Sequence, residues 1–183
     1  AVVSHALPTQ DPVHQITIVP RGQAAGMTIN RPQEDRSHVT RQRLVETLST
    51  LLGGRAAEET ALGFVCTGAV SDLQRCTEIA RDMVTKYGMS EKLGNVTFST
   101  GHDEVFIGRS MAQAKPYSEE TAALIDSEVK ALIDAAFDRS REILTRDRDK
   151  LELVARFLLK NETMTAEQFQ LVYDDPDQLA AQL

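Results

Sequence analysis

The stretch that decides the fold reads Thr67-Gly-Ala-Val-Ser-Asp-Leu-Gln-Arg-Cys-Thr-Glu-Ile-Ala-Arg-Asp-Met-Val-Thr-Lys-Tyr87. At the 3.6-residue period of an α-helix its apolar side chains share one stripe, which predicts an amphipathic helix packed against a core. The stripe contains Asp72, Cys76, Ile79, Ala80, Met83 and Tyr87, with Leu73 and Val84 beside it. Asp72 is the exception on this apolar face, because a carboxylate aimed at a core needs a hydrogen-bond donor, a cation or a metal as its partner.

Two interpretations of Asp72 stay open from the residues alone. Ser71-Asp-Leu-Gln74 matches a capping box, which would place Asp72 in the first helical turn, where the helix dipole favours an anion. The other interpretation is that the carboxylate binds a specific partner such as a metal ion. Helical spacing does not decide between them.

Length and composition indicate one soluble globular domain, or one such domain with an appendage. The chain has 183 residues, of which 42% are hydrophobic and 26% charged, and this is enough to build one core. Its formal charge of −7 disfavours nucleic acid as a partner. No apolar run approaches the roughly 20 residues that span a bilayer. The chain opens on Ala-Val-Val rather than methionine, so we expect further residues upstream, where a membrane anchor could lie.

Neither the cysteines nor the histidines form a metal-binding motif by spacing. Cys66 and Cys76 lack a Cys-x-x-Cys arrangement and fit a reducing compartment better than a metal site. No two histidines stand at i, i+4, the spacing that would put both on one helical face. We expect structural or solvated roles for His5, His14 and His38. The full set is His5, His14, His38 and His102.

The first third of the chain predicts a small sheet and then a helix. Residues 1–7 are expected to end a helix at Pro8. β-branched residues within 11–21 predict a strand, and residues 26–30 predict a second extended segment. Together they give a small sheet with at least one exposed edge.

Residues 40–61 carry leucines at helical spacing, which predicts a buried amphipathic helix. Gly53 and Gly54 fall in its middle, where each costs on the order of 1 kcal/mol relative to alanine. They either separate two helices or keep one helix free of side chains where another backbone approaches. Glu58 and Glu59 follow and are, by default, exposed charges.

The remaining pattern is mostly helical. Residues 95–99 are a possible strand, and residues 100–117 an extended connection. Residues 118–144 predict the longest helix, and residues 147–160 a second helix, antiparallel to the first because the link is short.

A last short helix is expected to follow. Thr165-Ala-Glu-Gln168 is a capping box that opens it, with Phe169 and Val172 facing inward. The acidic tail from Asp174 is expected to be loose. The predicted fold class is therefore mainly α, with a small β element near the N-terminus.

Several short stretches, taken in order, run along nearly the whole chain: Ala1-Val-Val-Ser-His-Ala-Leu-Pro8, Asp11-Pro-Val-His14, Ile16-Thr-Ile-Val-Pro-Arg-Gly22, Leu51-Leu-Gly-Gly-Arg-Ala-Ala-Glu-Glu59, Ser71-Asp-Leu73, Thr77-Glu-Ile-Ala-Arg81, Tyr87-Gly-Met-Ser-Glu-Lys-Leu-Gly94 and Asp147-Arg-Asp-Lys-Leu-Glu-Leu153. In this order and spacing the chain resembles the M41-type peptidase domain of the FtsH family. That family consists of membrane-anchored, ATP-dependent AAA+ zinc metalloproteases.

The resemblance implies an enzyme, a zinc-dependent metalloendopeptidase that degrades unfolded and membrane proteins. Its domains assemble as a homo- or hetero-hexamer, into which an AAA+ ring feeds polypeptide substrates at the expense of ATP. One Zn²⁺ per complete subunit is held by two histidines of a His-Glu-x-x-His helix and by an aspartate farther along the chain. The glutamate of that motif is the general base. The family's aspartate falls on Asp72, which is thereby implied to be a metal ligand.

The same resemblance places the His-Glu-x-x-His motif immediately before Ala1. No catalytic residue is therefore expected within this chain, which lacks the general base and two zinc ligands. We expect residues 1–183 to be one N-terminally truncated peptidase domain. Residues 1–99 would form its metal-site and substrate-strand half, and residues 118–173 its C-terminal helical half. The alternative is a catalytically inactive homologue that serves as a structural or substrate-binding subunit of the ring.

Further positions carry roles that the resemblance implies. Gly26, Met27, Thr28 and Ile29 fall on an edge strand that takes an extended substrate by β-augmentation. Glu58 or Glu59 would support the metal site from behind its ligands. Gly53 and Gly54 would let their helix pass close to the metal helix. The full-length protein would be anchored in a membrane through a segment outside this chain. It would use ATP through an AAA+ domain that also lies outside this chain. The present domain would be soluble and lie on the cytoplasmic, or equivalent organellar, side.

Overall fold

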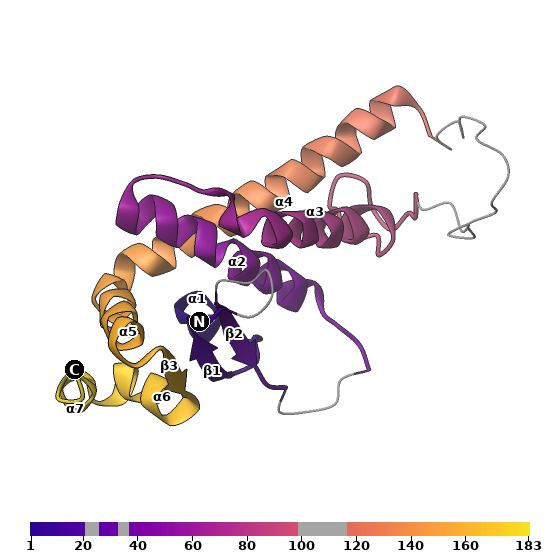
Figure 1. The fold of residues 1–183 in the computed structure, drawn as a ribbon. Coiled ribbons are helices and arrows are strands. Elements are labelled where there is room, and N and C mark those ends of the chain that lie inside the picture. The colour runs from indigo at the N-terminus through magenta and orange to yellow at the C-terminus, as the bar shows by residue number, and fades with distance from the viewer. Residues whose placement is uncertain (21–25, 33–36, 99–116) are drawn as a thin grey trace, which may run out of the picture.

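The computed structural model describes residues 1–20, 26–32, 37–98 and 117–183. It is mainly helical with a small antiparallel sheet, which confirms the predicted class (Figure 1). The elements are α1 (Val2–His5), β1 (Val13–Thr17), β2 (Met27–Asn30), α2 (Arg41–Ala57), the π-helical turn η1 (Glu58–Leu62), the 3₁₀ turn η2 (Thr67–Ala69), α3 (Val70–Thr85), α4 (Glu119–Arg146), α5 (Arg148–Asn161), β3 (Thr163–Thr165), α6 (Ala166–Asp174) and α7 (Pro176–Ala180).

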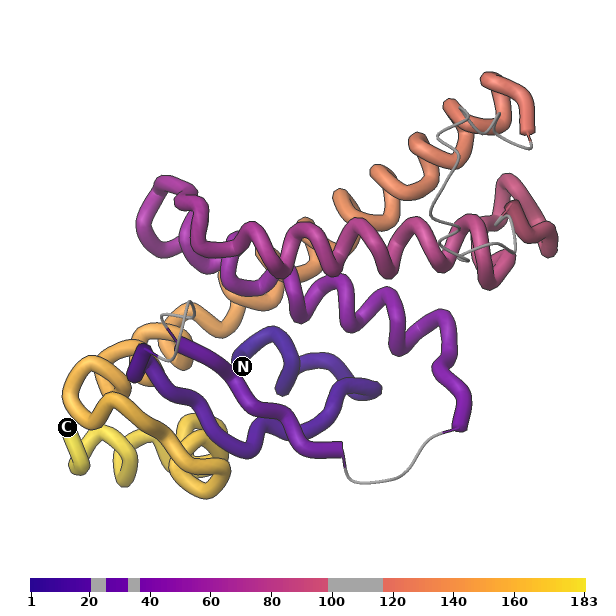
Figure 2. The backbone as a smooth tube through the Cα atoms, turned by 45° about the vertical axis from the view of Figure 1, so that its right-hand side comes forward, coloured from indigo at the N-terminus to yellow at the C-terminus, as the bar shows by residue number. Residues whose placement is uncertain are grey.

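Three long helices form one body of the molecule. The helix α4 packs against both α2 and α3, which also pack against each other (Figures 1 and 2). Ser140 of α4 donates from Oγ to the carbonyl oxygen of Ser49 in α2 at 2.7 Å, so a buried hydroxyl at this interface has a partner. The buried side chains of this core are Leu48, Leu52, Cys76, Ala80, Met83, Val84, Ile125, Val129 and Ala136. The amphipathic helices predicted within 40–61, 67–87 and 118–144 are thereby confirmed as α2, α3 and α4, although α2 ends at Ala57 and α3 at Thr85.

The helix α2 runs without a break through its two glycines. A Cβ on Gly53 would lie 3.2 Å from Val3 Cγ2 of α1, whereas a Cβ on Gly54 would meet nothing within 4 Å. Gly53 thus allows α1 to approach closely, and α1 lies between α2 and the sheet (Figures 1 and 2). The interpretation of one unbroken helix is confirmed.

The sheet has the strand order β2-β1-β3. Gln15 of β1 pairs with Ile29 of β2 on one side and with Thr165 of β3 on the other, both antiparallel. β2 is therefore an exposed edge, as expected. The sequence pattern did not predict β3, a strand of three residues from the far end of the chain.

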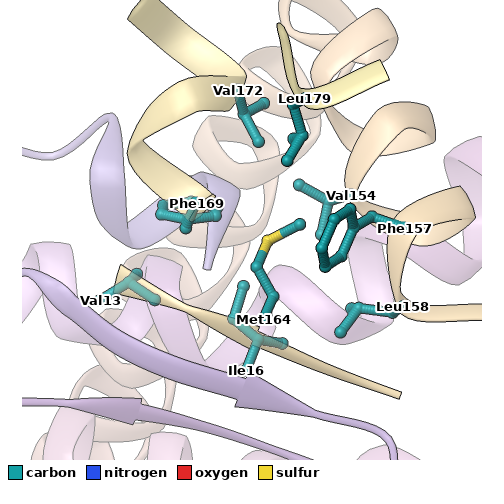
Figure 3. Close-up of a cluster of buried hydrophobic side chains, with 9 residues drawn as sticks. All are labelled: Val13, Ile16, Val154, Phe157, Leu158, Met164, Phe169, Val172 and Leu179. Carbon is teal, nitrogen blue, oxygen red and sulfur yellow. The ribbon is translucent and has the colours of Figure 1, made fainter. Parts of the chain in front are cut away.

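A second core lies between the sheet and the last three helices (Figure 3). Val13 and Ile16 of β1 and Met164 of β3 pack against side chains of α5, α6 and α7; those are Val154, Phe157, Leu158, Phe169, Val172 and Leu179. The predicted capping box of α6 is present, because the Thr165 side chain and the Gln168 side chain each bond the other's backbone.

The expectation of a loose tail after Asp174 is wrong. Residues 176–180 form α7, in which the Asp175 side chain accepts from the backbone N–H of Gln178. Leu179 is 0% exposed and closes the second core. This apolar side chain in an acidic segment is the part of the tail that enters the core.

The predicted antiparallel pairing of residues 147–160 with the long helix is also wrong. α5 turns away at Asp147 and packs against β3, α6 and α7 (Figures 1 and 2). Asp147 is 7% exposed and bonded by both Arg146 (2.6 Å) and Lys150 (3.0 Å), so the joint between the helices is a charged cluster.

Residues 95–98 form no strand, contrary to expectation. The backbone N–H of Phe98 instead donates to the carbonyl oxygen of Thr85 at the end of α3 (2.7 Å), and its ring meets that of Tyr117 edge-on at 5.8 Å. This segment therefore closes the end of the helical core. Arg21 at the end of the first predicted strand, Ser99 at the end of the possible strand and residues 100–116 of the predicted connection lie outside the described residues. No helix in the described ranges is long and apolar enough to cross a membrane.

Candidate functional site

A cleft of about 570 Å³ opens between the sheet and the helical body. This volume is typical of a ligand-binding site. Its walls come from the first residue and from the β1, β2, α2 and α3 segments, so it gathers residues that are far apart in sequence. They are Ala1, Ile16, Thr17, Ile18, Gly26, Met27, Thr28, Asn30, Thr50, Leu51, Gly54 and Asp72.

Asp72 lies in the first turn of α3, as one interpretation predicted. The capping box proposed for it is wrong, because α3 begins at Val70 and its N-cap residue is Ala69, which makes no side-chain cap bond. Ser71 is thus inside the helix.

The Asp72 side chain is exposed and lines the cleft, rather than facing the core as its place on the apolar stripe suggested. Asp72 lies in the first turn of α3, before the helix enters the core. The buried side chains of the stripe begin one turn later, at Cys76. The stripe also ends early, since α3 stops at Thr85 and Tyr87 is 56% exposed. Partial desolvation raises the pKa of Asp72, and Arg75 opposes this effect.

The two cysteines are not equivalent. Burial, and secondly the charge of Asp72, raise the pKa of the Cys76 thiol to about 11, so this sulfur stays protonated at neutral pH. Cys66 is exposed and donates from Sγ to Oε1 of Glu58 at 2.5 Å. The structure places neither cysteine in the lining of the cleft.

The edge strand contributes one wall of the cleft. Gly26, Met27 and Thr28 line it, whereas Ile29 does not and is 37% exposed. A Cβ on Gly26 would lie 2.7 Å from the carbonyl oxygen of Thr17, so only glycine allows the chain to enter β2 this close to β1. The structure therefore brings three of the four predicted strand residues together with Asp72.

Glu58 and Glu59 lie away from the cleft lining. Glu58 accepts hydrogen bonds from the Cys66 side chain and, at 3.0 Å, from its backbone N–H, and these bonds lower the pKa of the carboxyl. Glu59 pairs with Arg141 of α4 at 3.6 Å. Glu58 thus contacts the segment that precedes α3, whereas Glu59 contacts α4.

Asp72 offers one carboxylate oxygen donor of the kind that zinc accepts. Within residues 1–20, 26–32, 37–98 and 117–183 no group of three or more His, Cys, Asp or Glu side chains is placed to hold a metal. His5 stacks on Tyr173 with ring centroids 3.8 Å apart, and His14 is exposed on β1. His38 is exposed just before α2, and His102 lies outside the described residues.

Sequence reasoning did not assign Thr50, Leu51 or Asn30 to the site. Thr50 and Gly54 share one face of α2 at the i, i+4 spacing, and this was the available signal for that wall. Nothing in the sequence marked Asn30, because its side chain bonds Ser4 in α1 and Asp11 in the loop between α1 and β1, which are both distant in sequence.

Comparison with known proteins shows a family match that covers the whole lining of the cleft. Residues 1–172 match Peptidase family M41. The chain is 49% identical over 96% of its length to the "ATP-dependent zinc metalloprotease FtsH" of Caldicellulosiruptor bescii. It is 45% identical over 97% to "ATP-dependent zinc metalloprotease FtsH 1" of Thermoanaerobacter sp., and 47% identical over 94% to the "ATP-dependent zinc metalloprotease FtsH" of Bacillus subtilis.

The chain spans 29%, 29% and 27% of the lengths of these three relatives. The stretches that border the cleft, from Ala1 to Asp72, all fall within the matched region. With nearly half of its residues identical to such relatives along almost its whole length, the chain belongs to peptidase family M41, as an M41 peptidase domain of the FtsH family.

Proposed function

We propose that residues 1–183 act as one proteolytic domain of an ATP-dependent zinc metalloendopeptidase. The observation that carries this proposal is that the carboxylate of Asp72 and the edge strand β2 line the same cleft. A metal ligand and a substrate-binding strand must lie in one cleft for a metallopeptidase to work. Residues 1–99 supply the cleft, and residues 118–173 supply helices that support it.

Asp72 is proposed to be one zinc ligand. Its oxygen donors, its place in the cleft and its partial desolvation all suit a cation as partner. The other ligands and the general base are assigned to a His-Glu-x-x-His helix that would precede α1. When bound, zinc would polarise the scissile carbonyl and lower the pKa of a bound water.

The edge strand β2 is proposed to bind the substrate. An extended polypeptide that adds as a further strand uses its main-chain hydrogen bonds, which every sequence offers, and this suits a protease for unfolded and membrane proteins. Met27 and Thr28 line the cleft and would contact alternate substrate side chains.

Glu58 is proposed to support the site indirectly. By bonding the backbone and the thiol of Cys66, it fixes the turn that leads into η2 and α3, and so the place of Asp72. Glu59 is proposed to brace the same turn through Arg141.

The rest of the enzyme is proposed from the relatives' names and the share of their length that this chain covers. An AAA+ domain outside this chain would use ATP, and a membrane segment outside it would anchor the protein with this domain on the cytoplasmic or equivalent organellar side. Six subunits, alike or mixed, would form a ring with one zinc each.

The test uses the full-length protein that contains this chain. We expect about one zinc per subunit and degradation of an unfolded polypeptide such as casein. Asp72→Asn should lose the zinc and reduce degradation by more than roughly 100-fold. This exceeds the effect of losing a side chain that only supports a metal ligand. The matched control is Asp82→Asn on the same helix, where Asp82 pairs with Lys86 at 3.0 Å, and it should keep both properties. Full zinc content in Asp72→Asn would sink the assignment.

A further inference from the structure

The last residue of β2 is tied to α1 by a single side chain. Asn30 donates from Nδ2 to Oγ of Ser4 at 2.6 Å and to the carbonyl oxygen of Asp11 at 2.9 Å. A carbonyl oxygen only accepts, so the amide must turn its nitrogen toward Asp11, and the orientation of the group is fixed. Ser4 lies in α1 and is 2% exposed. One amide thus joins the edge strand, the helix α1 and the loop between α1 and β1.

That loop is in turn fixed to α2. The Asp11 carboxylate pairs with Arg43 at 2.6 Å, and both side chains are mostly shielded, at 16% and 18% exposed. Arg43 also donates to the carbonyl oxygen of Thr9, whose backbone N–H donates to Glu46 at 2.8 Å. The loop segment that Asn30 bonds is therefore held against α2, which forms one wall of the cleft.

The strand ladder alone holds β2 weakly. β2 has four residues and, within the described part of the chain, pairs with β1 on one side only. This pairing shifts register between Val13 and Gln15. Short edge strands with irregular pairing are prone to slip, and a slip of one residue moves the strand by about 3.3 Å and turns each side chain to the other face. The Asn30 amide supplies a fixed point at the end of β2, next to that irregularity.

We propose that Asn30 is a positioning residue, which through Ser4 sets the place of β2 relative to α1. A substrate strand paired with β2 then meets the metal end of the cleft in the correct register. This inference rests on the proposed peptidase function and adds to it the contact that aligns substrate with the reacting centre. A misplacement of about 1 Å can cost on the order of 100-fold in rate, so such a contact affects the chemical step.

The experiment uses full-length protein with two variants. Asn30→Asp is isosteric, but places an oxygen against the Asp11 carbonyl, and Ser4→Ala removes the other partner without touching the edge strand. Each should keep the zinc content of the wild type and lose about 10- to 100-fold in kcat on a defined peptide, with a smaller change in KM. The double variant should lose less than the product of the two single losses, because both changes act on the one side chain that places β2. The cleavage positions within the peptide should also spread.

The matched control is Asn161→Asp at the end of α5, where the same kind of amide donates to a carbonyl oxygen, that of Phe157, at 3.2 Å outside the cleft. It should keep the wild-type kcat. Wild-type kcat in both site variants, multiplying losses in the double variant, or zinc loss in Asn30→Asp would each overturn the assignment. If Asn30→Asp does not fold, Ser4→Ala decides alone. A wild-type protein with neither zinc nor proteolysis would overturn the proposed function, and this inference with it.

Discussion

Tyr173 carries a polar atom in an apolar setting. Its ring stacks on His5 and lies 4.6 Å from Lys150 Nζ, a cation–π distance, while its hydroxyl is buried without a hydrogen-bond partner among the described residues. Burial, followed by the charge of Asp147, raises the pKa of Tyr173, so the hydroxyl stays neutral. The ring stabilises the contact between α1 and α6, whereas the hydroxyl adds a desolvation cost.

Tyr173→Phe is therefore expected to stabilise the protein by about 1 kcal/mol, because it removes a buried polar group that gains nothing in return. Urea denaturation followed by circular dichroism measures this change. Tyr87→Phe is the control, since Tyr87 is 56% exposed and should shift the free energy of unfolding by much less. A clear loss of stability in Tyr173→Phe would mean that the hydroxyl has a partner.

At the scale of single helices, α2 allows a comparison of two adjacent glycines. Gly54→Ala should stabilise the helix by roughly 0.5–1 kcal/mol, since a Cβ there meets nothing within 4 Å. Gly53→Ala should be less stable than Gly54→Ala by about 1 kcal/mol, because its Cβ would lie 3.2 Å from Val3 Cγ2. Thermal unfolding of the two variants measures the difference. In a Val3→Ala background, the difference should shrink; if it does not, Val3 is not its cause.

The joint between α4 and α5 predicts a pH dependence. Hydrogen bonds from Arg146 and then Lys150 lower the pKa of Asp147 below its ordinary value near 3.8. Its ionised form therefore stabilises the fold fully above about pH 4, and this contribution is lost as the pH falls through the lower, folded-state pKa. Both cations are partly exposed, at 61% and 37%, so we expect only about 1 kcal/mol.

Asp147→Asn should therefore be less stable than the wild type at pH 7, and the gap should narrow below pH 4. Denaturant titrations at a series of pH values provide the measurement. Asp149→Asn, an exposed neighbour in the first turn of α5, serves as the control and should show a smaller gap. A gap that stays constant down to pH 2 would contradict the proposed role of the charge.

For the whole molecule, the stability of the C-terminal body should depend on α7. Leu179 is 0% exposed and packs among the side chains of the second core (Figure 3). Leu179→Ala should cost about 3 kcal/mol, the usual range for a leucine truncated in a core. Leu183→Ala, at 36% exposed, should cost much less. Equal effects of the two variants in chemical denaturation would show that α7 is not docked in solution.

The helices were predictable because their signals are local. The amphipathic stripes of α2, α3 and α4, and the capping box of α6, each lie within one segment. The strand β3 was not predictable in this way, because it pairs with β1, which is distant in sequence. The direction of α5 and the docking of α7 depend on packing between separate elements, which a pattern within one segment does not encode.

The candidate site shows the same division. Asp72 stood out locally as a carboxylate on an apolar stripe, although its exposure depends on where α3 begins. The cleft itself could not be derived from periodicity, because its walls are built from segments that span residues 1 to 72. Asn30 carried no local signal, because its partners lie in α1 and in the loop between α1 and β1.

The pairing of β1 with β3 has a consequence for biosynthesis. Thr17 and Thr163 bond through their hydroxyls at 3.1 Å across a sequence separation of 146 residues. Contacts of such separation form late, because a long loop must close before they stabilise anything. During translation, β1 therefore waits with one edge unpaired until residues 163–165 have left the ribosome, which exposes a template for pairing with other chains. We expect this domain to bind chaperones while it is being synthesised, and to reach its protected state only after residues 163–165 emerge.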